Sequence, residues 1–217
     1  MKKLFLPILC LAFLFGCKSM QSYTHEEKQF CPVVPVIKRI VVLPFDIPSN
    51  APFGLVKEGK IEEGSVEKLS TFTEEKLKSF GCFDVVSWEE VLEKLQYEDN
   101  GKILLEAKRG YKDDIIKLGK TFKADAVLMG YVTKYVEREG KEYGTMKPAS
   151  VSFHLFLYSG IDGSLLWKGS YKETQQALSE NLFNLGLYMK RGIKWLTADE
   201  LANWGLKEVL KNFPGRK

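Results

Sequence analysis

Cys17 is the residue of this sequence whose thiol is best placed for a chemical modification, because it directly follows a signal-like apolar segment. It follows an apolar run from Leu4 to Phe15 and one small residue, and the sequence becomes polar directly after it. Two lysines precede the apolar run. A positive start, an apolar stretch and a small residue at the cleavage point, in this order, are typical of a secretory signal peptide. Because a spanning helix needs about 20 apolar residues, the run is too short to cross a membrane. We therefore expect residues 1–16 to be a signal peptide that is removed before Cys17.

The four residues LFGC that end at Cys17 resemble the lipobox of bacterial lipoproteins, although Phe15 replaces the small residue usual there. In that family the cysteine thiol receives a diacylglycerol, and the new amino group is acylated after cleavage. The resemblance implies lipidation of Cys17 and stable membrane anchoring, since two lipid signals already suffice for that. Lys18 and Ser19 follow, in place of the aspartate that marks inner-membrane retention, which implies the outer membrane, facing the periplasm. The alternative is an ordinary signal peptide in which Cys17 is incidental.

Two further cysteines, Cys31 and Cys82, would remain after Cys10 leaves with the signal peptide. In an oxidising compartment such a pair can form a disulfide. Cys31 lies just before the first expected strand and Cys82 at the start of the second, so the two can meet if these strands are parallel neighbours. The alternative is two free thiols, one of them buried.

The two histidines do not form a convincing catalytic set. His25 lies in the expected linker, and His154 lies in a strand with Ser152 two residues away on the same face. A nucleophile, its base and an orienting group usually converge from separate loops. No Cys/His cluster has the spacing of zinc ligands. We expect no enzyme, no cofactor and no metal, and a periplasmic hydrolase using Ser152 and His154 is the weakest alternative.

The stretch GLVKEGKI, from Gly54 to Ile61, has the G-x-x-x-x-G-K spacing of a phosphate-binding loop. That loop needs Ser or Thr after the lysine to hold Mg²⁺, and it follows directly from a strand. Here Ile61 takes that position and a proline-containing loop intervenes, so we expect no nucleotide. The net charge of +4 falls to +2 without the signal peptide, which gives no case for nucleic-acid binding.

The 217-residue chain, 45% hydrophobic and 28% charged, has the composition of one folded domain with terminal extensions. Residues 17–37 are expected to be the lipidated cysteine and a linker, polar at first and then interrupted by prolines. About 20 flexible residues span about 25 Å. We assign residues 38–176 to an α/β sandwich domain and residues 177–217 to a helical C-terminal extension packed on it.

Strand and helix patterns alternate along this domain and then give way to strands alone. Alternation predicts a parallel core, whereas tight turns such as Asp162-Gly163 predict antiparallel additions. We therefore expect the α/β (α+β) class: a mixed sheet of about five strands, ordered βαβ(α)αβ and then antiparallel hairpin strands, with helices on the sheet and a C-terminal helix. The expected strands are 40–43, 82–87, 126–138, 149–160 and 165–176, and the expected helices are 65–80, 87–98, 113–123 and 197–213.

Three stretches, RIVVLPF, KADAVLMGYVTKYVER and VSFHLFLYSGIDGSLLWKGSYKET, resemble a domain of periplasmic lipoproteins. This domain is shared by the TolB amino-terminal module, the curli-secretion pore subunit and the activator lipoproteins of penicillin-binding proteins. The resemblance covers about Arg39 to Thr174. It implies an α/β sandwich and an envelope role in binding a partner, activating it or assembling an export complex. It implies no catalytic residues.

Four residues in these stretches have chemistry that suits a scaffold rather than a ligand site. The carboxylate of Asp125 can accept backbone N–H bonds at a helix-to-strand turn. Gly130 inside a strand indicates a close backbone approach or a bulge. Asp162 begins a hairpin turn, over which Trp167 can pack.

The C-terminal part carries the candidate partner surface. The segment 182–196 is more apolar than one helix face requires, so it is either buried in the core or exposed as an interaction patch. A capping box, Thr197 to Glu200, opens the last helix. Trp204 falls on that helix's polar face, where it packs on the preceding segment or docks a partner. The candidate surface comprises Leu182, Phe183, Leu187, Met189, Trp195 and Trp204.

The function expected from these features is that of an outer-membrane-anchored periplasmic lipoprotein. It would bind the membrane through its acyl chains and serve as a non-enzymatic binding and assembly module for a protein of the envelope machinery. The second hypothesis is an oligomeric secretion or pore-associated subunit resembling the curli exporter, although the turn at 139–144 is too short for that family's extra membrane strands. The partner's identity and the oligomeric state stay open.

Overall fold

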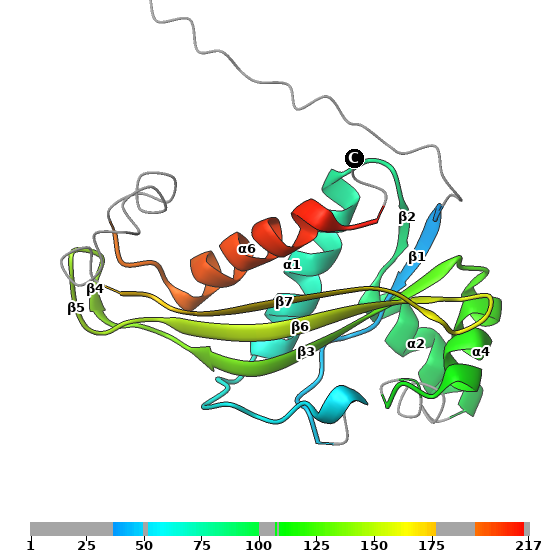
Figure 1. Ribbon diagram of the computed structural model, residues 1–217, viewed down its shortest axis with the longest axis horizontal. Helices are drawn as coiled ribbons and strands as arrows, with labels where there is room; N and C mark the ends of the chain where they lie inside the picture. The colour runs from blue at the N-terminus through cyan, green and yellow to red at the C-terminus, as the bar shows by residue number, and fades with distance from the viewer. Residues whose placement is uncertain (1–36, 50–51, 100–106, 108, 177–193, 215–217) are drawn as a thin grey trace, which may run out of the picture.

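A mixed five-stranded sheet forms the centre of the domain (Figure 1). The computed structural model describes residues 37–49, 52–99, 107, 109–176 and 194–214. The strand order is β2-β1-β3-β6-β7, with β1 parallel to both β2 and β3 and the remaining pairs antiparallel. This confirms the predicted fold class. The strands are β1 (Arg39–Val42), β2 (Asp84–Val86), β3 (Ala126–Val136), β6 (Ser150–Ser159) and β7 (Leu165–Thr174).

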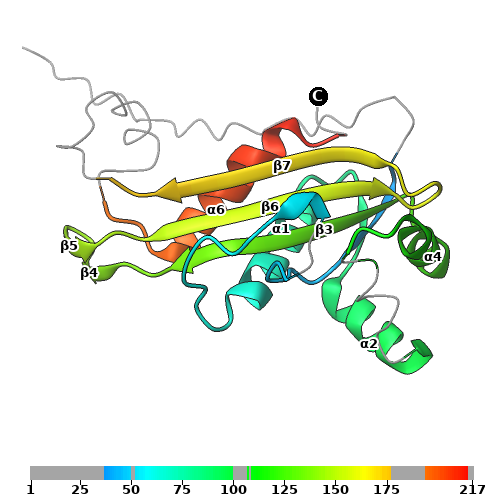
Figure 2. The same ribbon diagram turned by 60° about the horizontal axis from the view of Figure 1, so that its bottom comes forward.

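Helices cover both faces of this sheet (Figures 1 and 2). α1 and α6 pack on one face, and α2 and α4 pack on the other, towards the end that carries β1 and β2. In the part of the chain that the structure describes, no helix combines the length and the apolar character needed to cross a membrane. The helices are α1 (Ser65–Ser79), α2 (Trp88–Asp99), α4 (Lys112–Phe122) and α6 (Ala198–Val209), with short 3₁₀ turns η1 (Pro52–Gly54) and η3 (Leu210–Asn212).

The alternation of side chains along β6 explains the two layers. Phe153 and Leu155 face the core beneath α1 and α6, whereas Phe156 and Tyr158 face the core beneath α2 and α4. This is the period of two that the sequence predicts for a strand. β1 is buried on both faces, as its continuous apolar run predicts.

Local signals in the sequence set the helix boundaries. α1 ends just before Gly81, which has the left-handed φ of 65° that a residue with a Cβ adopts only with strain. α6 begins with the predicted capping box, in which Thr197 and Glu200 bond each other's backbone N–H groups. In α4, Ile115, Leu118, Gly119 and Phe122 are buried, which is the spacing of one helix face.

Asp125 and Gly130 have the scaffold contacts that the sequence predicts. The Oδ2 atom of Asp125 accepts hydrogen bonds from the backbone N–H groups of Lys38 at 2.8 Å and Arg39 at 2.9 Å, which joins the start of β1 to the start of β3. At Gly130 the ring of Phe45 lies where a Cβ would be. The close approach predicted for this glycine is confirmed.

Two predicted details differ from the structure. Trp167 does not pack over the Asp162 turn; its ring makes an edge contact with Phe213 at 5.0 Å, because the alternation along β7 turns it towards α6. The expected turn at 139–144 is itself a small antiparallel hairpin of β4 (Glu139–Lys141) and β5 (Gly144–Lys147). Its strands pair through their backbones, and the hydroxyl of Thr145 in β5 also donates to the carbonyl of Glu139 in β4 at 2.8 Å.

Candidate functional site

The last helix, α6, packs closely on the edge strand β7 because each element contributes a glycine at the contact. The side chain of Val209 in α6 occupies the space in which a Cβ of Gly169 would lie. The ring of Tyr171 in β7 likewise lies against Gly205 of α6. These two contacts fix the helix against the strand and leave hollows on both sides of it.

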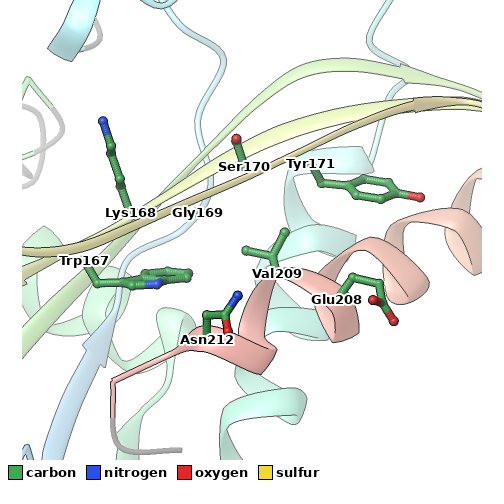
Figure 3. Close-up of a pocket in the computed structure, with 8 residues that line it drawn as sticks. All are labelled: Trp167, Lys168, Gly169, Ser170, Tyr171, Glu208, Val209 and Asn212. Carbon is green, nitrogen blue, oxygen red and sulfur yellow. The ribbon is translucent and has the colours of Figure 1, made fainter.

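The first hollow, which we call the β7 groove, runs between the outer edge of β7 and the end of α6 (Figure 3). Its volume is about 340 Å³. Figure 3 shows Trp167 on the α6 side of the strand, whereas Lys168 and Ser170 point away from it. The face of β7 towards α6 thus carries aromatic rings, the α6 side of the groove adds Val209 together with the polar Glu208 and Asn212, and the opposite face of β7 carries Lys168. It is lined by Trp167, Lys168, Gly169, Ser170, Tyr171, Glu208, Val209 and Asn212.

Packing beneath the groove holds its aromatic side chains in place. The ring of Trp167 rests on Phe213, which itself contacts Phe83 with 5.7 Å between ring centroids. The hydroxyl of Tyr171 donates a hydrogen bond to the Glu173 carboxylate at 2.6 Å. The groove therefore has a preformed aromatic wall.

The second hollow, which we call the Trp204 hollow, lies on another side of α6 and has a volume of about 320 Å³. Lys194 reaches the Glu200 carboxylate at 2.7 Å and Glu142 at 3.5 Å. Burial acts to raise the pKa of Glu200, but its hydrogen bond and charge interaction with Lys194 outweigh this and lower that pKa. The hollow therefore holds an indole among charged side chains. It is lined by Lys76, Lys194, Leu196, Glu200, Asn203, Trp204 and Lys207.

The predicted partner surface is only partly described. Trp204 is half-buried and lines the second hollow together with Leu196. Trp195 is half-buried, and its backbone N–H donates to the carbonyl of Glu142 at 2.9 Å, so it is held at the β4–β5 hairpin. Leu182, Phe183, Leu187 and Met189 lie outside the described residues.

The cysteine predictions rest on residues at the margin of the described chain. β1 and β2 are parallel neighbours, with Arg39 opposite Asp84, which is the arrangement a Cys31–Cys82 bridge requires. Cys82 is disulfide-bonded. Cys17 and Cys31 lie outside the described residues, so lipidation and the pairing with Cys31 stay predictions.

Ser152 and His154 do not have the surroundings of a hydrolytic site. Ser152 is 1% exposed, and its hydroxyl accepts a hydrogen bond from Thr133 at 2.8 Å. Burial lowers the pKa of His154, against the opposing charge of Glu58. Glu58 is itself paired with Lys172 at 2.9 Å. The Ser152 hydroxyl and the Glu58 carboxylate are therefore already bonded to Thr133 and Lys172.

The G-x-x-x-x-G-K stretch also has a structural use. The backbone N–H groups of Glu58 and Gly59 both donate to the carbonyl of Thr133, at 2.9 and 3.2 Å. Groups that must cradle a phosphate are therefore already bonded along the edge of β3. Across the described ranges, no three His, Cys, Asp or Glu side chains come together as metal ligands would.

Sequence reasoning missed the β7 groove, although a signal was present. Gly169 in a strand and Gly205 in a helix are both positions where glycine costs stability unless another group approaches closely. Pairing these two glycines, however, requires knowing that α6 crosses β7. That contact joins residues far apart in the chain.

No family model matches this sequence, and no curated protein matches it. Among solved structures, the chain is similar to the lipoprotein GNA1162 from Neisseria meningitidis, with 21% identity, a TM-score of 0.44 and coverage of 70% of this chain and 93% of that one. It is similar to the PelC dodecamer subunit from Paraburkholderia phytofirmans, with 11% identity, a TM-score of 0.47 and coverage of 87% and 95%.

A third similar structure is the LpoB C-terminal domain from Salmonella enterica, with 14% identity, a TM-score of 0.37 and coverage of 67% and 88%. The similar structures thus include a bacterial lipoprotein. At these identities and TM-scores, the similarities assign neither a family nor an activity to this chain.

Proposed function

We propose that this protein is an outer-membrane-anchored periplasmic lipoprotein whose α/β domain is a non-enzymatic binding module for a protein of the envelope machinery. The observation that carries the proposal is the pair of hollows beside α6, which combine aromatic side chains with a charged rim. Aromatic residues in partly enclosed positions supply much of the binding energy at protein interfaces, whereas charged rims favour one partner over another.

The polar residues elsewhere in the domain support a binding role over a catalytic one. Asp125 ties two strands together, and Ser152 is enclosed in the sheet. Asp162 accepts hydrogen bonds from the backbone N–H and the hydroxyl of Ser164 in its turn, at 3.2 and 2.8 Å. These carboxylates and this hydroxyl, which could otherwise serve in catalysis, thus form hydrogen bonds that stabilise the fold.

Lipidation of Cys17 would give this module its location. The linker of about 20 residues would let the domain reach partners within about 25 Å of the membrane surface. Binding there benefits from a raised effective concentration, because the partner and the tethered domain share the same thin layer. The oligomeric secretion subunit remains the second hypothesis.

Site-specific photo-crosslinking in growing cells tests the proposal. A photoreactive residue in place of Asn203, at the rim of the Trp204 hollow, should yield a crosslink to an envelope protein. The same residue in place of Lys120, an exposed position on α4, is the matched control and should not yield that product. Trp204→Ala should weaken the crosslink from position 203. Absence of any product specific to position 203 would contradict the proposed binding role of this surface.

A further inference from the structure

We propose that the outer edge of β7 accepts an extended segment of the partner protein as an additional strand, and that this segment alternates acidic and apolar side chains. The inference rests on the proposed function, since it states how the module recognises its partner. It concerns the β7 groove and the edge beside it, and it does not involve the Trp204 hollow.

The edge itself is the first observation. β7 ends the strand order of the sheet and spans ten residues. Within the described ranges, no strand pairs with its outer side along Leu165–Ser170. An edge of this length presents a row of backbone donors and acceptors that a further strand can use.

Exposed apolar side chains at the start of this edge are the second observation. Leu165 and Leu166 are 40% and 44% exposed, and Ile161 in the preceding turn is 77% exposed. Natural edge strands are commonly protected by short length, charges or proline, because apolar edges associate with other chains. Here the first two strand residues lack that protection, which favours a partner on this edge.

The β7 groove is the third observation, because it lies where alternate side chains of an added strand would go. A paired strand lies about 4.8 Å from its neighbour, with its side chains alternating between the two faces of the sheet. Those on the α6 side would enter the groove beside Trp167 and Val209. Apolar side chains suit the part of this wall that Trp167 and Val209 form. Those on the other face would lie beside Lys168 and Ser170.

Charge on that other face defines the rest of the partner segment. Lys168 is exposed and makes no ion pair with any described residue. Lys172, on the same face, pairs with Glu58 but has a side chain that is 72% exposed. Acidic side chains opposite these lysines would be attracted, since oppositely charged cross-strand pairs stabilise a sheet.

The same charges disfavour a second copy of this chain on the edge. In antiparallel self-pairing, residues on one face meet residues on the same face of the other copy. If the two copies pair symmetrically about residue 168, 169 or 170, Lys168 lies directly opposite or diagonal to a lysine of the second copy. Like charges in these positions destabilise a strand pair. A different, acidic segment is therefore the occupant that this edge fits.

Peptide binding to the full-length protein in detergent micelles tests the proposal. The probe is a fluorescent peptide of four Glu-Val repeats, and its counterpart has four Lys-Val repeats. We expect the acidic peptide to bind, and Lys168→Glu to weaken it by about fivefold or more. The basic peptide should bind Lys168→Glu more tightly than the original protein. Lys120→Glu, the same charge change on α4, should leave both affinities unchanged.

Strand pairing has its own readout. Methylating alternate amide nitrogens along one edge of the acidic peptide should abolish binding, whereas methylating those of the opposite edge should not. The proposal is overturned if the acidic peptide does not bind, if both methylated peptides bind alike, or if Lys120→Glu weakens binding as much as Lys168→Glu. A salt-resistant dimer that excludes the peptide would likewise overturn it, in favour of a second copy.

The outcome separates this inference from the proposed function. If the peptides fail while position 203 still crosslinks to an envelope protein, strand addition at β7 is wrong and the binding role stands. If neither the peptides bind nor position 203 crosslinks, both proposals are wrong.

Discussion

Single carboxylates hold the ends of secondary-structure elements in this domain, and Asp125 is the clearest case. One of its oxygens accepts two backbone N–H groups at the start of β1, while its own chain position starts β3. The residue type and its place at a helix-to-strand turn allowed this role to be predicted. The identity of the donors, 86 and 87 positions away in sequence, could not be.

Replacing Asp125 by Ala should lower the free energy of unfolding by about 2 to 3 kcal/mol, because two backbone donors lose a charged acceptor. Urea denaturation measures this. Asp84→Ala is the control: it removes an exposed ion pair with Arg39 and should cost less than about 1 kcal/mol. Equal costs for the two variants would show that Asp125 does not join the strands as described.

Asp162 makes a pH-dependent contribution. Hydrogen bonds from the side chains of Ser159 and Ser164 lower its pKa from 3.8 to about 2. Because the pKa of this carboxyl is lower in the folded protein than in the unfolded chain, the ionised group stabilises the fold at pH values above the unfolded pKa of 3.8. This contribution is lost as the pH falls from 3.8 through about 2. Ser159→Ala should raise the pKa towards 3.8, as followed by carboxyl carbon chemical shifts. An unchanged midpoint would contradict the assigned hydrogen bonds.

Among the elements, α6 and β7 depend on each other through two glycines. Gly169→Ala should destabilise the protein by about 1 to 3 kcal/mol, because Val209 and Trp167 must move to make room for the new methyl group. Thermal and urea unfolding both test this. Gly144→Ala is the matched control, since nothing lies within 4 Å of its Cβ position, and it should change stability by less than about 0.5 kcal/mol. Similar losses in both variants would rule out close packing at Gly169.

The parallel pairing of β1 and β2 supports a bridge between Cys31 and Cys82. Non-reducing peptide mapping of the mature protein should give one linked peptide containing both residues. Reduction should lower stability by up to about 4 kcal/mol, since the bridge closes a loop of roughly 50 residues. Recovery of Cys31 as a free thiol would refute the pairing.

Local patterns predicted most elements, whereas long-range contacts set the details that were missed. β-branched runs, alternation and caps located the strands and helices, including both faces of β6. The position of Trp167 could not be predicted, because it depends on Phe213 packing across β7. The β7 groove was missed for the same reason: only the strand order makes β7 an edge.

At the scale of the whole molecule, most of the polar groups described above maintain the structure, and two hollows lie beside α6, which we propose to bind a partner. In the proposed function its location would depend on a single modification at Cys17, ahead of the described domain. Without that tether, the linker and the hollows would belong to a freely diffusing protein, and the proposed envelope role would lose its physical basis.

Mass spectrometry of the N-terminal peptide from purified cell envelopes tests this claim most directly. We predict that the chain begins at Cys17, carrying a diacylglycerol on its sulfur and an acyl chain on its amino group, and that this form partitions with outer-membrane vesicles. An unmodified Cys17, or an intact residue 1–16 segment, in protein that stays soluble after lysis would contradict the account.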